Sequence, residues 1–208
     1  MKRRAALKRL GLTSAAIVAT PTLLSLLNSC TTEQQLWKPQ FLSQEGGKVL
    51  QKMADVFLPK TNLPSASELN IPEFIDKYLK NVFLNEEQVL FKAAYDKTLN
   101  KLKIHSQKGV DDLEDKDIQN FLDDHLKVNG EIDIERQSNI SYEGLTISEC
   151  LHTIKFMCID AYITNKKIGE DVLAYDPVPG TYYCDDLETL TEGKRWSLGN
   201  NTVKRKPK

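Results

Sequence analysis

Apolar residues recur at helical spacing along most of the chain after residue 42, and polar or proline-rich stretches separate the apolar segments. The first segment follows Ser43, a residue type favoured at helix N-caps, and stops before Pro59. Residues 59–72 contain three prolines among polar residues, which predicts a loop, and Pro72 suits the first turn of a second helix. The side chains expected on the apolar faces of these two helices are Leu50, Met53, Ala54, Phe57, Phe74, Ile75, Tyr78, Leu79 and Val82.

Two further helices are predicted between residues 85 and 130. Asn85 is the expected N-cap of the third helix, and Gly109 is its expected stop. The fourth helix is expected to start at Asp115 or Asp117 and to end before Gly130. Their apolar positions are Leu90, Phe91, Ala94, Tyr95, Leu99, Leu102, Ile118, Phe121, Leu122 and Leu126.

A fifth helix is predicted after the polar, irregular stretch 131–145. Its N-cap is either Thr146 or Ser148, and the pattern becomes rich in turns after Gly169. It is more apolar than the other four helices, so it is expected to lie at the centre of the fold. No alternating pattern long enough for a sheet is present. The sequence therefore predicts an all-α fold, a single helical-bundle domain of five or six helices.

Residues 174–182 form a proline-rich segment that is expected to lie on the surface of the domain, and we call it the strap. Two prolines and a glycine fall within four positions, so the segment is expected to be extended rather than helical. Such a segment loses little conformational entropy on docking, which makes it a candidate partner-binding surface. A strap that only covers the protein's own core fits the pattern equally well. The candidate interface residues are Tyr175, Asp176, Pro177, Pro179, Gly180 and Tyr182.

The first thirty residues have the pattern of an export signal. A basic start is followed by an uncharged, largely apolar stretch from Leu10 to Ser29. The residues Arg3, Arg4, Leu7 and Lys8 resemble the twin-arginine pattern, which directs the export of proteins that are already folded. Adjacent arginines also occur by chance in signals of the general export route.

Cys30 is the candidate site of lipid attachment, because residues 27–30 resemble a lipoprotein cleavage box. Lipidation predicts an exported, periplasmic, membrane-anchored bacterial lipoprotein, since more than one acyl chain gives stable anchoring. An uncleaved signal that remains as a membrane anchor is the alternative. The resulting layout is a signal at 1–29, a tether at 30–42, the helical domain at 43–199 and a basic tail at 200–208.

The charge of the remaining chain argues against a nucleic-acid partner. Of the 208 residues, the signal holds five basic and no acidic ones, which leaves 23 basic and 29 acidic residues and a net charge of about −6. The only basic cluster outside the signal is the short tail at 204–208. A nucleic-acid binder needs a basic face, and the sequence provides none.

Three cysteines besides Cys30 can form an internal disulfide in an exported protein. Cys150 and Cys158 are predicted to lie on one helix, about 12 Å apart along its axis, which is beyond disulfide reach. An internal bond would therefore join Cys184 to one of them, and the third thiol would remain unpaired or bond to another chain. Buried thiols that never form a bond are an equally good interpretation.

No catalytic, cofactor-binding or metal-binding motif is found in the sequence. It lacks the dinucleotide fingerprint, the c-type haem attachment motif, a cysteine cluster for an iron–sulfur centre, and the serine hydrolase and zinc protease signatures. His105, His125 and His152 are scattered, and His125 and His152 are best explained as core histidines. A nucleophilic pair of Cys158 with His125 rests on no motif.

Four features in order resemble the small subunit (subunit 3, or gamma) of gluconate 2-dehydrogenase and related flavin-dependent sugar dehydrogenases. They are the twin-arginine signal, the segment from Phe57 to Ala66, the segment from Ile71 to Asp76, and the strap. The likeness spans nearly the whole chain. It departs from the family where Asn62 replaces a usual Asp and where a common nearby Gly is missing.

The resemblance implies a non-catalytic accessory subunit with an α-helical fold and no cofactor of its own. In the family, a separate large subunit of the GMC type carries FAD and oxidises the sugar or sugar acid. A cytochrome c subunit often passes the electrons on. The small subunit binds the large one, and its signal is thought to export the folded, flavin-loaded partner. The alternative is a stand-alone helical envelope lipoprotein with a structural or ligand-binding role.

Overall fold

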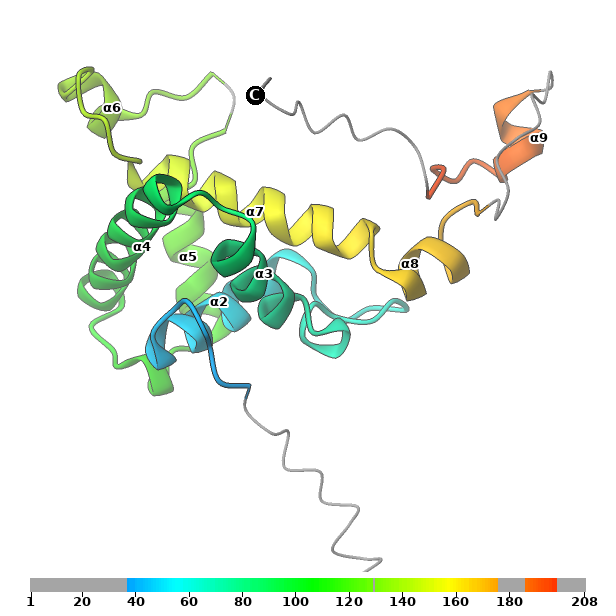
Figure 1. Ribbon diagram of the computed structural model, residues 1–208, viewed down its shortest axis with the longest axis horizontal. Coiled ribbons are helices and arrows are strands. Elements are labelled where there is room, and N and C mark those ends of the chain that lie inside the picture. Colours follow the sequence, from blue (N-terminus) through cyan, green and yellow to red (C-terminus); the bar gives the residue numbers. More distant parts are fainter. Residues whose placement is uncertain (1–36, 129, 176–185, 198–208) are drawn as a thin grey trace, which may run out of the picture. The chain divides into compact units, whose positions relative to one another are not determined.

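The computed structural model describes residues 37–128, 130–175 and 186–197, and the prediction of an all-α fold is confirmed (Figure 1). Over these residues the chain forms eight α-helices and two short 3-10 helices, with no named strand. In chain order the elements are α2 (Gln44–Phe57), η1 (Ser67–Leu69), α3 (Ile71–Asn81), α4 (Asn85–Ser106), η2 (Val110–Asp112), α5 (Asp115–His125), α6 (Ile134–Ser138), α7 (Ile147–Ile163), α8 (Lys166–Asp171) and α9 (Leu187–Thr191).

The five predicted helices correspond to α2, α3, α4, α5 and α7. The structure adds three short helices, α6, α8 and α9, each of five or six residues. Helix α6 lies in the stretch that the sequence predicts to be irregular. A single turn carries too little hydrophobic periodicity to be detected by pattern alone.

Two helices start where the sequence predicts them, because a hydroxyl side chain caps each. The Oγ of Ser43 accepts a hydrogen bond from the Gly46 N–H at 3.0 Å. At the start of α7, Thr146 is the N-cap and Ser148 is not. The Glu149 N–H donates to the Thr146 hydroxyl at 3.2 Å, and the Glu149 carboxylate accepts from the Thr146 N–H at 2.9 Å. This reciprocal capping box satisfies two donors that the helix itself leaves unpaired.

Helix α4 differs from the prediction at both ends. Leu84, not Asn85, is the extended residue at its start, and the Glu87 carboxylate accepts the Leu84 N–H at 3.0 Å. At the other end Gln107 adopts the left-handed conformation, with φ of 54°, so the helix ends before Gly109. Gly109 instead precedes the short helix η2.

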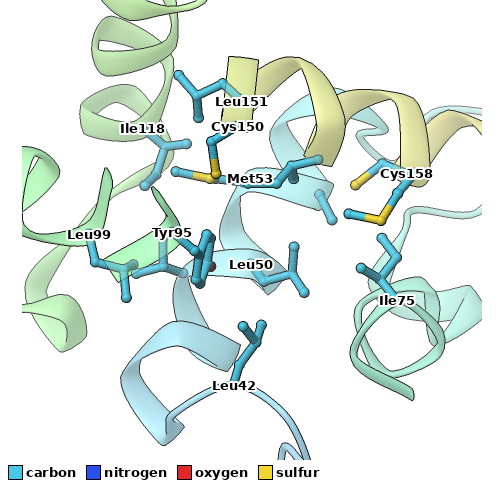
Figure 2. Close-up of a cluster of buried hydrophobic side chains, with 14 of the residues drawn as sticks. Leu42, Leu50, Met53, Ile75, Tyr95, Leu99, Ile118, Cys150, Leu151 and Cys158 are labelled. Atoms are coloured by element: carbon cyan, nitrogen blue, oxygen red, sulfur yellow. The ribbon is translucent and has the colours of Figure 1, made fainter. Parts of the chain in front are cut away.

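Helix α7 is central, as predicted, and it contacts α2, α3, α4 and α5. Side chains from these five helices meet in one buried cluster (Figure 2). Its largest fully buried members include Leu50, Met53, Ile75, Tyr95, Phe121, Leu151 and Ile154. The Tyr95 hydroxyl donates to the Gly46 carbonyl at 2.8 Å, so the one polar atom of this buried ring is satisfied.

Several apolar residues predicted to face the core are exposed instead. On α3, Phe74 is 52% exposed and Tyr78 is 36% exposed, and Val82, the C-cap of this helix, is 56% exposed. Leu90 on α4 is 41% exposed, and two apolar residues of the central helix α7, Phe156 and Ile159, are also exposed. Ile75 and Leu79 do face the core. The apolar face of α3 is therefore broader than the surface that the other helices cover.

The segment before α7 is shaped by one arginine. The Arg136 guanidinium binds both oxygens of the Glu149 carboxylate and also donates to the carbonyls of Tyr142 and Gly144. These charge-assisted bonds lower the pKa of Glu149 below its ordinary value. Because Glu149 also belongs to the capping box of α7, Arg136 fixes the loop to the start of the central helix.

Candidate interaction site

A shallow, mostly apolar groove lies between the start of α3 and the end of α7. Its volume is about 420 Å³. The residues that line it include Leu69, Asn70, Ile71, Phe74, Ala161 and Thr164. At its rim, Lys77 and Glu73 form an ion pair one helical turn apart, at 2.7 Å. We call this feature the α3–α7 groove.

One wall of the groove follows a loop that hydrogen bonds hold in place. The Asp55 carboxylate of α2 accepts from both the N–H and the hydroxyl of Ser67, at 2.9 and 2.5 Å. From α7, the Tyr162 hydroxyl donates to the Pro64 carbonyl at 2.9 Å. These contacts tie the loop between α2 and α3 to two helices of the bundle. The groove is therefore built before any ligand or partner arrives.

A row of aromatic rings leads from the groove into the core. Phe74 stacks on Tyr78, Tyr78 meets Phe83, and Phe83 meets Phe91, with ring centroids 6.0 to 6.2 Å apart. Phe91 in turn stacks on the buried Tyr95 at 5.8 Å. Aromatic pairs at such distances add about 0.5–1.5 kcal/mol beyond the burial of their area. The row couples the exposed side of α3 to the packed interior.

The segment just before α2 is anchored by a buried carboxylate, that of Asp76. One of its oxygens accepts the Gln40 N–H at 2.6 Å, and the other accepts the Phe41 and Leu42 N–H groups at 3.1 and 2.9 Å. We call residues 38–42 the tether root. A Cβ on Gly47 would lie 2.4 Å from Pro39 Cγ, so the close approach of the root requires glycine there.

The predicted partner-binding strap is described only at its start. Ala174 pairs with the segment around Trp196: its N–H donates to the Arg195 carbonyl at 3.0 Å, and its carbonyl accepts the Ser197 N–H at 2.9 Å. Tyr175 is exposed. The other candidate interface residues, Asp176, Pro177, Pro179, Gly180 and Tyr182, lie outside the described residues. The strap remains a prediction.

Cys150 and Cys158 are fully buried free thiols on α7. Burial raises the pKa of each thiol to about 12. The thiolate is the reactive form of cysteine, so neither residue has the character of a nucleophile at neutral pH. Cys184 lies outside the described residues, and its pairing stays a prediction.

This burial predicts the reactivity of the two thiols. In a chain carrying Cys30→Ser and Cys184→Ser, a maleimide reagent at pH 8 is expected to modify no cysteine in the folded protein. In guanidinium chloride it should modify two. At pH 8 a thiol with a pKa near 12 has about one part in ten thousand as thiolate. Rapid labelling of the folded protein, followed by mass spectrometry, would contradict the buried placement.

Two of the three histidines lie together: the rings of His105 and His125 are 5.7 Å apart, centroid to centroid, and both contact Phe121. His105 pairs with Asp124 at 2.9 Å. The prediction that His152 is a core histidine is wrong: the residue is exposed on α7, with its ring against the Lys127 carbonyl. The His125 ring stacks on Phe121 at 4.4 Å, and its Nδ1 bonds to the Phe121 carbonyl at 3.0 Å. Partial burial lowers the pKa of His125. Within the described residues, no group of three or more metal-ligating side chains has a geometry suited to a metal ion.

The proposed export and anchoring residues cannot be placed in this fold. Arg3, Arg4, Leu7, Lys8 and Cys30 all lie outside the described residues. Among the helices that the structure describes, none is long and apolar enough to cross a bilayer.

Sequence reasoning missed the buried Asp76 and the exposed face of α3. A signal for Asp76 was present, because it lies one residue after Ile75 and three before Leu79, both on the buried face. A charged residue at such a position needs a partner. The backbone donors of the tether root provide it.

The comparisons with known proteins identify one family. The family model described as gluconate 2-dehydrogenase subunit 3 matches residues 44–180, which is well over half of the chain. The matched region includes the α3–α7 groove and all of the buried core except Leu42. No match was found among the curated proteins or among the solved structures.

Proposed function

This chain belongs to the gluconate 2-dehydrogenase subunit 3 family, and we propose that it is the non-catalytic small subunit of a membrane-associated, flavin-dependent dehydrogenase complex. Its partner in this proposal is a large GMC-type subunit that carries FAD and oxidises gluconate or a related sugar. A cytochrome c subunit accepts the electrons in complexes of this kind. The small subunit's tasks are to bind the large one, to take it across the membrane and to hold it there.

The observation that carries the proposal is the α3–α7 groove, an apolar hollow inside the matched region. Phe74 stands at its edge with half of its side-chain surface in water. Aromatic residues beside apolar hollows are typical anchors of protein interfaces, because they bury much area at little cost in conformational entropy. The groove is large enough for one or two side chains of a partner.

The groove is also suited to binding because it is rigid. The loop that forms one wall is bonded to Asp55 on α2 and to Tyr162 on α7. Because the loop is already ordered in the free protein, binding a partner does not cost the conformational entropy of ordering it. The strap extends the proposed interface through Tyr175. This residue belongs to the part of the strap that the structure describes, and it is exposed.

Export and anchoring complete the proposal. The twin-arginine route accepts folded cargo, so a signal on this chain can export a flavin-loaded partner that has none. Arg3 and Arg4 carry that role, with Leu7 and Lys8 behind them. Lipidation of Cys30 then keeps the complex at the periplasmic face of the membrane.

One assay separates the two roles, with the amount of flavoprotein in the periplasmic fraction as the measurement. Replacing Arg3 and Arg4 with Lys is expected to leave both this chain and the partner in the cytoplasm. The Phe74→Asp variant should be exported normally but should lose its partner, because a carboxylate in an apolar interface is left without a hydrogen-bonding partner. We expect at least about tenfold weaker binding for this variant.

The matched control for Phe74→Asp is Ile104→Asp. Ile104 is an exposed apolar residue near the C-terminal end of α4, and it does not line the groove. This control should retain and export the partner like the unchanged chain. If the partner reached the periplasm without the arginine pair, the escort role would be wrong. If Phe74→Asp and Ile104→Asp behaved alike, the groove would not be the interface.

The alternative, a stand-alone envelope lipoprotein, makes the opposite prediction for the same cells. Affinity purification from membranes would then yield this chain alone, without flavin absorbance. An enzyme in its own right would oxidise gluconate with a dye acceptor in the absence of any flavoprotein. The burial of the core thiols, which raises the pKa of each to about 12, does not support such an activity.

A further inference from the structure

The turn between α3 and α4 carries an exposed apolar surface that the α3–α7 groove does not include. Val82 and Leu84 are 56% and 69% exposed, and Val89, one turn into α4, is equally exposed. Tyr78 lies beside them, with its ring against Phe83 at 6.0 Å. We call residues 78–84 the α3–α4 corner. Isolated exposed apolar side chains are common, but a group of this kind indicates a contact surface.

The corner lies next to the tether root. The ring of Phe91 contacts Phe83 of the corner on one side and Phe41 of the root on the other, at 6.2 and 6.5 Å. The Lys80 ammonium of α3 reaches the Gln40 side chain at 3.4 Å. Together with the Asp76 carboxylate, these contacts fix the root against the same part of α3.

We propose that the α3–α4 corner rests on the surface of the lipid bilayer and inserts its apolar side chains at the level of the headgroups. This proposal depends on the lipid anchor at Cys30 that the proposed function contains. A chain from Cys30 to Gln40 spans at most about 35 Å when fully extended. The anchor therefore confines the root, and with it the corner, close to the membrane. At such an effective concentration, even weak contacts with lipid are formed.

The side chains of the corner are of the kinds found at membrane surfaces. Tyr78 has an apolar ring with a polar tip, and Lys80 has an apolar stem with a charged head. Within the described residues, Lys80 forms no ion pair, so its ammonium is available to a phosphate group. Glu86 and Glu87 are close by in the first turn of α4 and offset this charge. The apolar side chains should therefore dominate, and the contact should depend little on salt.

A matched pair of labelled positions on one helix tests the proposal. Leu84→Cys and Ile104→Cys have similar exposure, 69% and 72% for the native residues. They lie about 30 Å apart along α4, at 1.5 Å per residue. Each is placed in the Cys184→Ser chain with Cys30 retained, and the folded lipoprotein is labelled with a fluorescent maleimide. It is then reconstituted into phosphatidylethanolamine–phosphatidylglycerol vesicles that contain a phospholipid with a headgroup nitroxide.

The label at position 84 is expected to be quenched at least about twofold more strongly than the label at position 104, since interfacial side chains lie within about 10 Å of the headgroups. Two results would overturn the contact of the corner with the bilayer but not the lipid anchor. The first is equal quenching at positions 84 and 104. The second is no quenching at position 84 in a chain that is bound to the vesicles, as shown by its flotation with them in a density gradient. The second result would also be found if a protein partner or a second copy covered the corner. A chain that does not float at all lacks the anchor, which would overturn both the anchoring and this proposal. Equal thermal unfolding of the two variants confirms that both are folded.

Discussion

Replacing Asp76 with Asn is expected to lower the free energy of unfolding by about 3 kcal/mol, with urea unfolding as the measurement. The carboxylate is fully buried and accepts the backbone N–H groups of Gln40, Phe41 and Leu42. Hydrogen bonds to a charged group contribute about 1.5–3 kcal/mol each in net terms, and they are not additive. A domain of this size is stable by only about 5–15 kcal/mol, so the loss is a large part of the total.

Asn is the informative substitution because it keeps the size of the side chain. An amide has one acceptor oxygen, and its NH₂ group is a donor that would face other donors at this site. At least one of the three backbone N–H groups then loses its partner. We also expect faster hydrogen exchange at residues 40–42, because the tether root is held mainly by this side chain.

The control for Asp76 is Asp96→Asn, which changes an exposed carboxylate on α4. Its closest cation is Lys92 at 3.9 Å, and both side chains are about half exposed. Surface ion pairs of this kind contribute little, so the control should change stability by less than about 0.5 kcal/mol. If Asp76→Asn were equally mild, the root would not depend on the carboxylate. The geometry of the membrane contact proposed for the α3–α4 corner would then lose its basis.

The local signals for helices were sufficient to predict most of this fold. Ser43 and Thr146 cap their helices as expected, because a hydroxyl that satisfies a free N–H group is a property of the local sequence. Local signals were insufficient at Leu84 and Gln107. At both ends of α4 the boundary lies one or two residues before the residue that the sequence favours, Asn85 at the start and Gly109 at the end.

Which side of a helix is covered was harder to predict. The spacing of apolar residues places Phe74, Ile75 and Tyr78 on one broad face of α3, and only part of that face meets other helices. The spacing of apolar residues in the sequence does not indicate how many other helices pack against a given helix. The excess apolar surface is nevertheless what provides the groove and the corner, so the failed part of the prediction coincides with the candidate interaction surfaces.

Phe91 connects the core to both surfaces, and the Phe91→Ala variant is expected to lose about 4 kcal/mol of stability. The ring is 2% exposed and contacts Phe41, Phe83 and Tyr95. Its removal leaves a cavity where the tether root, the α3–α4 corner and the core meet. Surrounding rings can fill only part of such a space, because each is held by its own packing. Urea unfolding measures the loss.

Two control variants, Phe91→Leu and Val89→Ala, separate the loss of stability caused by the cavity from any loss caused by a substitution in α4 as such. Leu fills most of the space, so we expect a loss of about 1–2 kcal/mol for that variant. Val89 is exposed on the same helix, and its change to Ala should alter stability by less than about 0.5 kcal/mol. Hydrogen exchange in Phe91→Ala should rise at residues 40–42 and at residues 82–84 together, since one ring supports both segments. A rise confined to one of them would mean that the root and the corner are held independently, and the membrane contact would then have to be argued from the corner alone.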